Sequence, residues 1–182
     1  MIDPLSLSPA DLDADNSLRT RLESIRRMIG TTFAPLKPFF SESQPKICIV
    51  GPPAPYTSTS GALIPADAVD CRIRAVSVGN FHRTVPATML SALAVARTIR
   101  GTIVERQCRS ISNTGGSTSG TSLLFWKRAN TIRVGQPAGV SEATATLNDW
   151  GQPESILYVR TARCIMTGYV LIPQSIFVRD TV

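Results

Sequence analysis

The sequence is poor in metal-binding residues and in long apolar runs. It has one histidine among 182 residues, and its four cysteines lie far apart without a C-x-x-C pair. Zinc sites are built from closely spaced cysteines and histidines, so we expect no metal here. No apolar run approaches the roughly 20 residues that a membrane-spanning helix requires. The acidic N-terminal stretch lacks the basic-then-apolar order of a secretory signal, which predicts a cytoplasmic protein without membrane contact.

The four cysteines carry no further signal of reactivity. Cys48 lies within KICIV and Cys164 within ARCIM, two apolar stretches typical of strands. A thiol in such a place usually behaves as a small buried hydrophobic group. We therefore predict that both cysteines are structural and buried rather than reactive.

Aromatic residues are also few, at 6% of the chain, although the net charge is +6 and the pI is near 9.6. A basic protein that binds nucleic acid usually clusters its cationic side chains and interleaves them with aromatic ones. Here the arginines are scattered without a long basic run. We expect no nucleic-acid partner and interpret the charge as solvated faces that also attract an anionic small molecule.

The overall composition is that of a globular protein, with 43% hydrophobic residues and a mean hydropathy of +0.08. Such a length allows one well-buried domain, or one lobe with an arm. Residues 1–15 are acidic and contain proline, which predicts a flexible lead-in. The apolar residues of 17–29 recur at helical spacing, so an amphipathic helix is expected there, capped by Asp15 or Asn16 and stopped by Gly30.

A strand and a helix of small residues are expected in the middle of the chain. In Asp70–Val78 apolar residues alternate with Arg72 and Arg74, which predicts a half-buried strand with both arginines on its wet face. The next helix is expected from Val85 or Pro86 to Arg100, with Gly101 as its stop. Further strands are predicted at 46–50, 131–134, 140–147, 155–160 and 164–172.

Two segments are rich in small polar residues. Gly51–Gly61 contains Tyr56, Thr57 and Ser58, whose hydroxyl groups are either surface groups, the favoured interpretation, or ligand donors. The Ser/Gly-rich segment at about 108–122 is typical of a loop, and either a lineage-specific insertion or an abnormal splice would produce it. No Gly-Lys-Ser/Thr follows its glycines, so it does not predict a phosphate-binding loop.

Several short motifs follow one another in a characteristic order. A strand ending in Val78-Gly79 leads to His82 and then to Thr88-Met89 at the start of the alanine-rich helix. IRVGQPAG, RTAR and GYVLIP follow within 132–173. In this order and spacing the chain, from Leu12 to Pro173, resembles the C-terminal lobe of the PrpF family, cofactor-free isomerases of aconitate-type acids.

The resemblance implies an α+β fold. Residues 16–182 would form one lobe of a diaminopimelate-epimerase-like architecture, with a mixed or antiparallel sheet wrapped around a central helix. It also implies proton-transfer isomerisation of di- or tricarboxylic acids such as aconitate and 2-methylaconitate, with no cofactor. The residues that move protons in this family, a lysine and a cysteine, belong to the first lobe. We expect this chain to lack that lobe, so no catalytic residue is assigned here.

Two turns are expected to face the substrate, because N–H groups at a helix start and in a glycine turn can hold carboxylates. By resemblance the substrate-binding residues are His82, Thr88, Met89, Gln136, Ala138 and Gly139. Three of them depart from the family pattern. Met89 replaces a common glycine and is expected to crowd the anion pocket, Gln136 replaces a histidine, and Ala138 replaces a serine.

His82 has two interpretations. As the sole histidine beside a strand-to-helix turn, it is a candidate anion ligand or general acid/base near neutral pH. It is equally a turn residue whose ring bonds to a backbone carbonyl.

Two functional hypotheses follow from these expectations. The chain is a PrpF-like isomerase that is truncated, or it is a non-catalytic remnant or partner subunit without the first lobe. The expected partners are a small carboxylic acid and either a first-lobe polypeptide or a second copy of the chain. An apolar face left without the first lobe would favour such an association.

Overall fold

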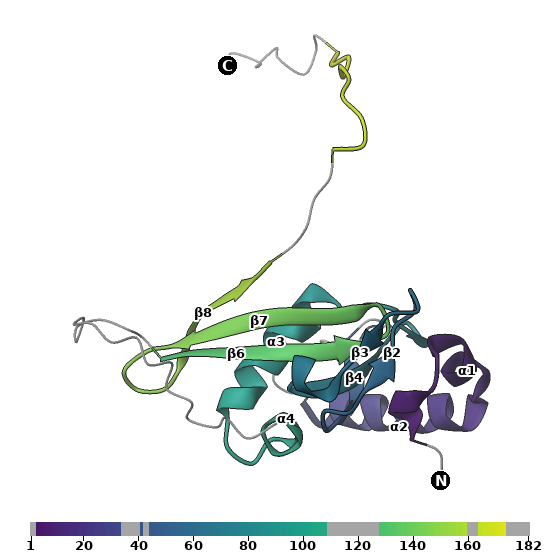
Figure 1. Ribbon diagram of the computed structural model, residues 1–182, viewed down its shortest axis with the longest axis vertical. Coiled ribbons are helices and arrows are strands. Elements are labelled where there is room, and N and C mark those ends of the chain that lie inside the picture. The colour runs from purple at the N-terminus through teal and green to yellow at the C-terminus, as the bar shows by residue number, and fades with distance from the viewer. Residues whose placement is uncertain (1–2, 34–40, 42–43, 109–127, 160–163, 174–182) are drawn as a thin grey trace.

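The computed structural model describes residues 3–33, 41, 44–108, 128–159 and 164–173 (Figure 1). Its α-helices are α1 (Pro9–Ala14), α2 (Asn16–Phe33), α3 (Ala87–Thr98) and α4 (Ile103–Gln107), and short 3-10 turns are η1 (Pro4–Ser6) and η3 (Ala66–Ala68). Its strands are β1 (Ile47–Gly51), β2 (Tyr56–Thr57), β3 (Leu63–Ile64), β4 (Cys71–Ser77), β5 (Asn80–Phe81), β6 (Arg128–Gln136), β7 (Gly139–Leu147) and β8 (Pro153–Tyr158). Beyond Cys108, the predicted insertion at 108–122 lies outside the described residues.

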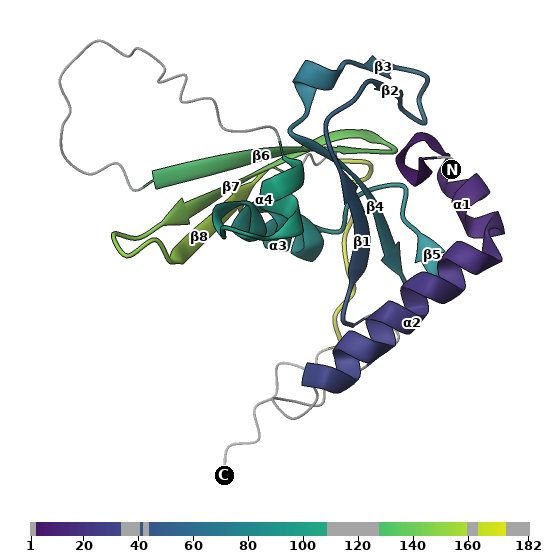
Figure 2. The ribbon, with the colours of Figure 1, turned by 90° about the horizontal axis from the view of Figure 1, so that it is seen from below.

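The main sheet surrounds one helix. Its strand order is β1-β4-β6-β7-β8, and β5 pairs with β4. The pairing of β4 with β6 is parallel and the other pairings are antiparallel, so the sheet is mixed. Helix α3 lies between β6–β8 on one side and β1 and β4 on the other (Figure 2). The expected α+β lobe with a central helix is confirmed.

Helix α3 is central because its side chains are apolar on nearly every side. Met89, Leu90, Leu93 and Ala94 are all buried in a core that β4, β6 and β7 complete. The helix is shorter than predicted, since it ends at Thr98 and not at Arg100. Gly101 lies in the turn that follows, before α4, and has φ +86°. The turn is a position that glycine tolerates without strain.

Within the lead-in, residues 4–6 form η1 and residues 9–14 form α1; the flexibility expected for 1–15 stays a prediction. Ser8 and Asp11 form a capping box that starts α1. Leu12 is fully buried against Leu22 of α2 and Phe81 of β5. This apolar contact holds the lead-in against α2 and β5. The acidic composition of the segment gave no sign of it.

Arg72 and Arg74 are buried, so the predicted wet face of their strand is wrong. The lead-in covers them: the Arg74 guanidinium donates to the carbonyl oxygens of Leu5 (2.6 Å) and Leu7 (3.1 Å). Arg72 donates to a carboxylate oxygen of Asp3 at 3.2 Å. Burial lowers the pKa of Arg74, and the neighbouring Arg72 charge lowers it further. Carbonyl and carboxylate oxygens of the lead-in therefore cover this face of β4 and bury both arginines.

Other boundaries differ less. The amphipathic helix predicted at 17–29 is α2, and the Asp15 carboxylate accepts a hydrogen bond from the Leu18 N–H at 2.9 Å at its start. Gly30 does not stop it, since α2 continues to Phe33. No helix among the described residues is long and apolar enough to cross a membrane.

The two cysteines predicted to be buried in strands behave differently. Cys48 lies in β1 and is partly buried, and burial raises the pKa of its thiol to about 11, as expected for a structural cysteine. Cys164 is exposed, and the described residues 164–173 form no strand, which corrects the strand predicted at 164–172.

Candidate functional site

The two turns expected to face a substrate lie side by side. One is the β6–β7 turn, in which Gln136 pairs with Gly139, and the other precedes α3. The Ala138 N–H donates to the Arg83 carbonyl oxygen at 3.0 Å, and the Val85 N–H donates to Gln136 Oε1 at 3.0 Å. The start of the central helix and a glycine-containing hairpin turn are thus fixed together.

Gln136 is the centre of this connection. Its side chain is buried, and its amide nitrogen also donates to Ser141 Oγ at 3.3 Å. Both ends of the amide are therefore used within the protein. Gln136 positions the two turns instead of presenting a polar group to solvent.

Tyr56 braces the same turn from behind. Its hydroxyl donates to the Gly139 carbonyl oxygen and accepts a hydrogen bond from the Gln136 N–H at 3.2 Å. Burial raises the pKa of Tyr56, although the bond from Gln136 opposes this rise. A Cβ on Gly135 would lie 3.0 Å from the Tyr56 ring, so this glycine lets the ring pack directly on β6. Tyr56 is neither a surface group nor a ligand donor, the two roles considered from sequence.

The start of α3 offers main-chain donors. Pro86 caps the helix without a side-chain hydrogen bond, and its carbonyl oxygen accepts from the N–H groups of Met89 and Leu90. Among the described residues, no acceptor is found for the N–H groups of Ala87 and Thr88. Thr88 is exposed, so its hydroxyl lies beside these donors at the surface. An N-terminus of this kind attracts anions through its unpaired N–H groups and the helix dipole.

The remaining predicted residues are placed as follows. His82 is half-buried, and its backbone N–H donates to the Ala75 carbonyl oxygen at 2.8 Å. The Met89 side chain is buried in the core around α3, so the expected crowding of an anion pocket is wrong. Ala138 is exposed at the tip of its turn, and Gly139 has φ +130°. The binding roles of these residues stay predictions.

Sequence reasoning missed an ionic cluster that supports the site. Asp70, just before β4, accepts hydrogen bonds from Arg97 Nη1 of α3 (2.8 Å) and from Arg133 Nη2 of β6 (2.9 Å). The Arg133 N–H also donates to it at 2.8 Å. Burial alone would raise the pKa of Asp70, but the bonds from Arg133 and Arg97 outweigh burial and hold it below its usual value. The position of Arg97 on the small-residue face of its helix was the only sequence signal.

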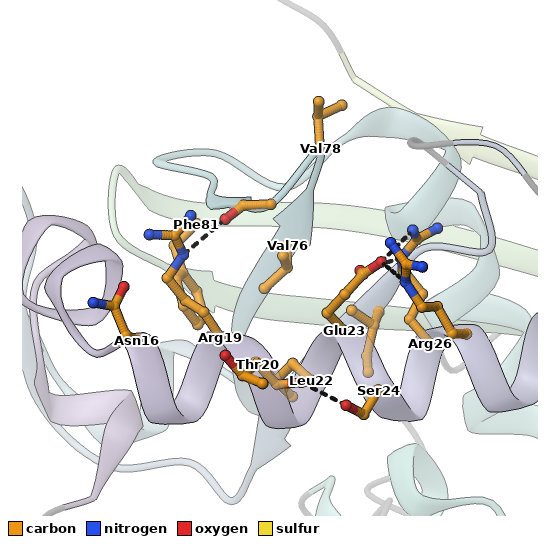
Figure 3. Close-up of a pocket in the computed structure, with 13 residues that line it drawn as sticks. Asn16, Arg19, Thr20, Leu22, Glu23, Ser24, Arg26, Val76, Val78 and Phe81 are labelled. Carbon is orange, nitrogen blue, oxygen red and sulfur yellow. Dashed lines mark hydrogen bonds and ion pairs between the residues drawn. The ribbon is translucent and has the colours of Figure 1, made fainter.

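A separate groove of about 600 Å³ lies between α2 and the β4–β5 hairpin (Figure 3). Its arginines are engaged: Arg26 and Arg27 both bind Glu23 at 2.7 Å, and Arg19 donates to the Gly79 carbonyl oxygen at 3.1 Å. The hydrogen bond from Arg26 is the main reason why the pKa of Glu23 falls to about 2. Because these arginines already have acceptors within the protein, a carboxylate ligand is expected to bind at the start of α3 and not in this groove.

Within the described part of the chain, no group of three or more histidine, cysteine or acidic side chains could hold a metal ion. The candidate site offers main-chain donors and the Thr88 hydroxyl, and the exposed residue Arg83 lies beside the hairpin turn because its carbonyl oxygen accepts from the Ala138 N–H.

Comparison with known proteins gives a consistent result. The family described as PrpF protein matches residues 6–173. A 2-methyl-aconitate isomerase of Shewanella oneidensis is 29% identical over 168 residues, which is 90% of this chain and 39% of that protein. A 3-methylitaconate isomerase of Eubacterium barkeri is 32% identical over 136 residues, which is 74% of this chain and 32% of that protein.

A solved structure shows the same fold. The crystal structure of a methylitaconate-delta-isomerase superimposes with a TM-score of 0.70 at 26% identity, covering 98% of this chain and 44% of that one. The chain thus spans less than half the length of the relatives it matches.

Proposed function

This chain belongs to the PrpF family, and from that premise we propose that it forms the carboxylate-binding half of an isomerase acting on aconitate-type acids. The half that moves protons would be a first lobe, by the family resemblance. The substrate is a small unsaturated di- or tricarboxylic acid, as the names of the relatives suggest for those proteins.

The observation that carries this proposal is the pairing of the two turns. Because Ala138 and Gln136 bond to Arg83 and Val85, the hairpin turn lies next to the stretch that leads into α3, whose first N–H groups are those of Ala87 and Thr88. Proton removal next to a carboxylate builds negative charge on its oxygens, and pre-positioned donors stabilise that charge. The Thr88 hydroxyl would add one more donor.

Proton transfer itself needs a base and an acid within reach of the substrate. Near the described site His82 is half-buried, Arg83 is exposed beside the hairpin turn, and the Tyr56 hydroxyl is committed to Gln136 and Gly139. This supports a division of labour, in which the present chain binds and polarises the acid while another lobe exchanges its proton.

The test is proton exchange with solvent. The full chain would be incubated in D₂O with cis-aconitate, trans-aconitate and 2-methylaconitate, alone and after co-expression with a first-lobe polypeptide, and deuterium uptake followed by NMR. We expect no uptake above a heat-inactivated control for the chain alone and uptake for the pair. Uptake by the chain alone would contradict the division of labour.

The binding role is tested with Thr88→Val in the active pair. Loss of one hydrogen bond to a charged group costs about 1.5–3 kcal/mol, so substrate exchange should slow roughly tenfold or more. Thr98→Val, at the opposite end of α3, is the matched control and should leave exchange unchanged.

A second candidate is a non-catalytic remnant or partner subunit. The observation favouring it is that both ends of the Gln136 side-chain amide are used within the protein, by Val85 and Ser141, and leave no polar group for a ligand. Absence of exchange in both the chain and the pair would leave this function in place of the first.

A further inference from the structure

Two cysteines from separate parts of the chain meet in the core around α3. Cys71 is the first residue of β4, and Cys108 follows α4 as its C-cap. Both belong to the same apolar cluster, with exposures of 0% and 8%, and both are free thiols. The two thiols share a hydrogen bond. The fold therefore creates a pair of adjacent thiols that no C-x-x-C spacing in the sequence indicates.

The surrounding elements hold both residues of this pair in place. The Cys108 N–H donates to the Val104 carbonyl oxygen at 2.9 Å, and Val104 is buried in the same cluster. Helix α4, which ends just before Cys108, packs against α3 and β1 (Figure 2). Cys71 pairs with Val134 of β6. Ordered elements on both sides therefore bring the thiols together, and a disulfide requires close and well-directed sulfur atoms.

Arg97 of α3 carries an unused hydrogen-bond donor in this core. Its Nη1 donates to the Asp70 carboxylate (2.8 Å) and to the Thr131 carbonyl oxygen (2.6 Å). Its Nε is buried and has no hydrogen-bond partner among the described residues, in a side chain that is only 8% exposed. The Arg97 charge acts on both thiols of the pair. An unpaired buried donor with a positive charge favours an anion beside it, and a thiolate is the anion that these cysteines supply.

The surroundings favour Cys108 as that thiolate. The hydrogen bond from the Cys71 thiol lowers the pKa of Cys108, and the Arg97 charge lowers it further, against burial and the charges of Asp70 and Glu105. The same hydrogen bond raises the pKa of Cys71, and burial adds to this rise. Cys108 is also the more exposed of the two. Because the thiolate is the reactive form of cysteine, Cys108 is the better nucleophile of the pair.

We propose that Cys71 and Cys108 form an oxidation site, at which a hydroperoxide converts the thiol pair into a disulfide. The Cys108 thiolate attacks one peroxide oxygen, the O–O bond breaks, and the leaving oxygen takes the Cys108 proton to become water or an alcohol. This step leaves a sulfenic acid on Cys108. The Cys71 sulfur then attacks the Cys108 sulfur, the S–O bond breaks, and water leaves with the Cys71 proton. Two electrons pass from the two sulfurs to the peroxide, and a dithiol reverses the change by exchange.

The disulfide would stabilise the lobe without touching the candidate carboxylate site. It closes a loop that contains β5 and α3, and closing a loop lowers the entropy of the unfolded chain. Arg97, beside the pair, lies in the last turn of α3, whereas the candidate site lies at the start of that helix. The oxidation site is therefore separate from the proposed isomerase function and does not rest on it.

The experiment treats the full chain with hydrogen peroxide near neutral pH and follows its intact mass. The double variant Cys48→Ala with Cys164→Ser keeps both residues of the pair and removes the other two thiols. We expect wild type and double variant each to lose two hydrogen atoms, a non-reducing digest to join Cys71 to Cys108, and dithiothreitol to restore the mass. The melting temperature should rise by about 5 °C or more on oxidation.

Single changes in the double variant separate the roles of the two thiols. Cys71→Ala should leave a sulfenic acid on Cys108, which dimedone traps, whereas Cys108→Ala should leave Cys71 unmodified. Arg97→Lys keeps the positive charge and removes Nε, so it should raise the pH at which oxidation is half-maximal and slow oxidation near neutral pH at least about twofold. Thermal unfolding shows which variants fold. The double variant remains decisive in every case, because it leaves the buried pair unchanged.

Four results with the double variant would overturn the proposal. They are oxygen addition without a cross-link, a disulfide that joins two copies of the chain, a cross-link that forms in urea but not in the folded protein, and a melting temperature that falls on oxidation. Each would show that the folded chain does not hold the two thiols ready for a disulfide. All of these readouts are independent of isomerase activity.

Discussion

Strand β6 and the last described segment, residues 164–173, here called the C-terminal arm, both contain β-branched residues but lie in opposite environments. Ile132 and Val134 of β6 are fully buried between α3 and neighbouring strands, whereas Val170 and Leu171 of the arm are almost fully exposed. Such β-branched residues favour strands in both segments. The residue types of a segment therefore indicate whether it can form a strand. Whether its side chains are buried depends on whether another part of the fold, as α3 does for β6, packs against it.

The largest effect is expected at the ionic cluster that ties β6 to the core. Asp70→Ala leaves the buried Arg97 without its carboxylate, which typically costs about 3–5 kcal/mol. Urea unfolding measures the free energy of unfolding. Asp67→Ala, a nearby exposed acid, is the control and should change it by less than about 0.5 kcal/mol.

The same cluster predicts a pH dependence. The pKa of Asp70 is lowered in the folded state, so its stabilisation is complete above the unfolded pKa near 3.9 and is lost as the pH falls through the folded value. Unfolding free energies of wild type and Asp70→Asn, measured from pH 6 down to 3, should converge on the acid side. Parallel curves would mean that the Asp70 charge does not stabilise the fold.

The next effect contrasts a leucine of the lead-in with one near the arm. Leu12→Ala removes a fully buried side chain and should destabilise the protein by about 3 kcal/mol. Leu157→Ala removes an exposed leucine of β8 and should cost less than about 0.5 kcal/mol in the isolated chain. Thermal and urea unfolding compare the two. Equal losses would show that β8 is covered in the isolated chain.

A smaller effect separates two tyrosines. Tyr56→Phe leaves the Gly139 carbonyl and the Gln136 N–H without their partner, which should cost about 1–3 kcal/mol. Tyr169→Phe in the arm removes a hydroxyl that faces solvent and should be neutral in the isolated chain. A neutral Tyr56→Phe would show that water replaces the hydroxyl behind the site.

The smallest effect has the opposite sign. Val78, in the β4–β5 turn, has φ +52° and is the only non-glycine residue with positive φ among those described. A β-branched residue is strained there by about 1–2 kcal/mol, whereas asparagine tolerates the conformation. Val78→Asn should therefore stabilise the protein by about 1 kcal/mol in urea unfolding. Val78→Ala, which keeps a Cβ, should gain less.

Local patterns predicted the elements better than their surroundings. The helix at 17–29 and the strands at 46–50 and 140–147 were predicted because helical and extended periods are visible in short windows. The alternation around Arg72 and Arg74 also predicted a strand correctly, but it assigned the arginines to solvent. Their cover comes from residues more than sixty positions earlier, and no local period reports such a contact.

The candidate site shows the same division. Family resemblance predicted two turns, and the structure shows that they meet through Ala138 and Gln136. It did not predict that Tyr56 braces one turn or that Asp70 joins three elements behind them. These residues bond to partners far away in sequence, so their roles cannot be predicted without the fold.

The sequence by itself determined the family, the α+β class and the apolar periods of the main helix and strands, because these depend on residue type and order. The tertiary structure decided which charged residues are interior, that the lead-in is part of the core, and that the arm is exposed. Each of these depends on whether a distant segment supplies an apolar layer or a hydrogen-bond acceptor, and burial of a charge or an apolar side chain is favourable only where that layer or acceptor exists.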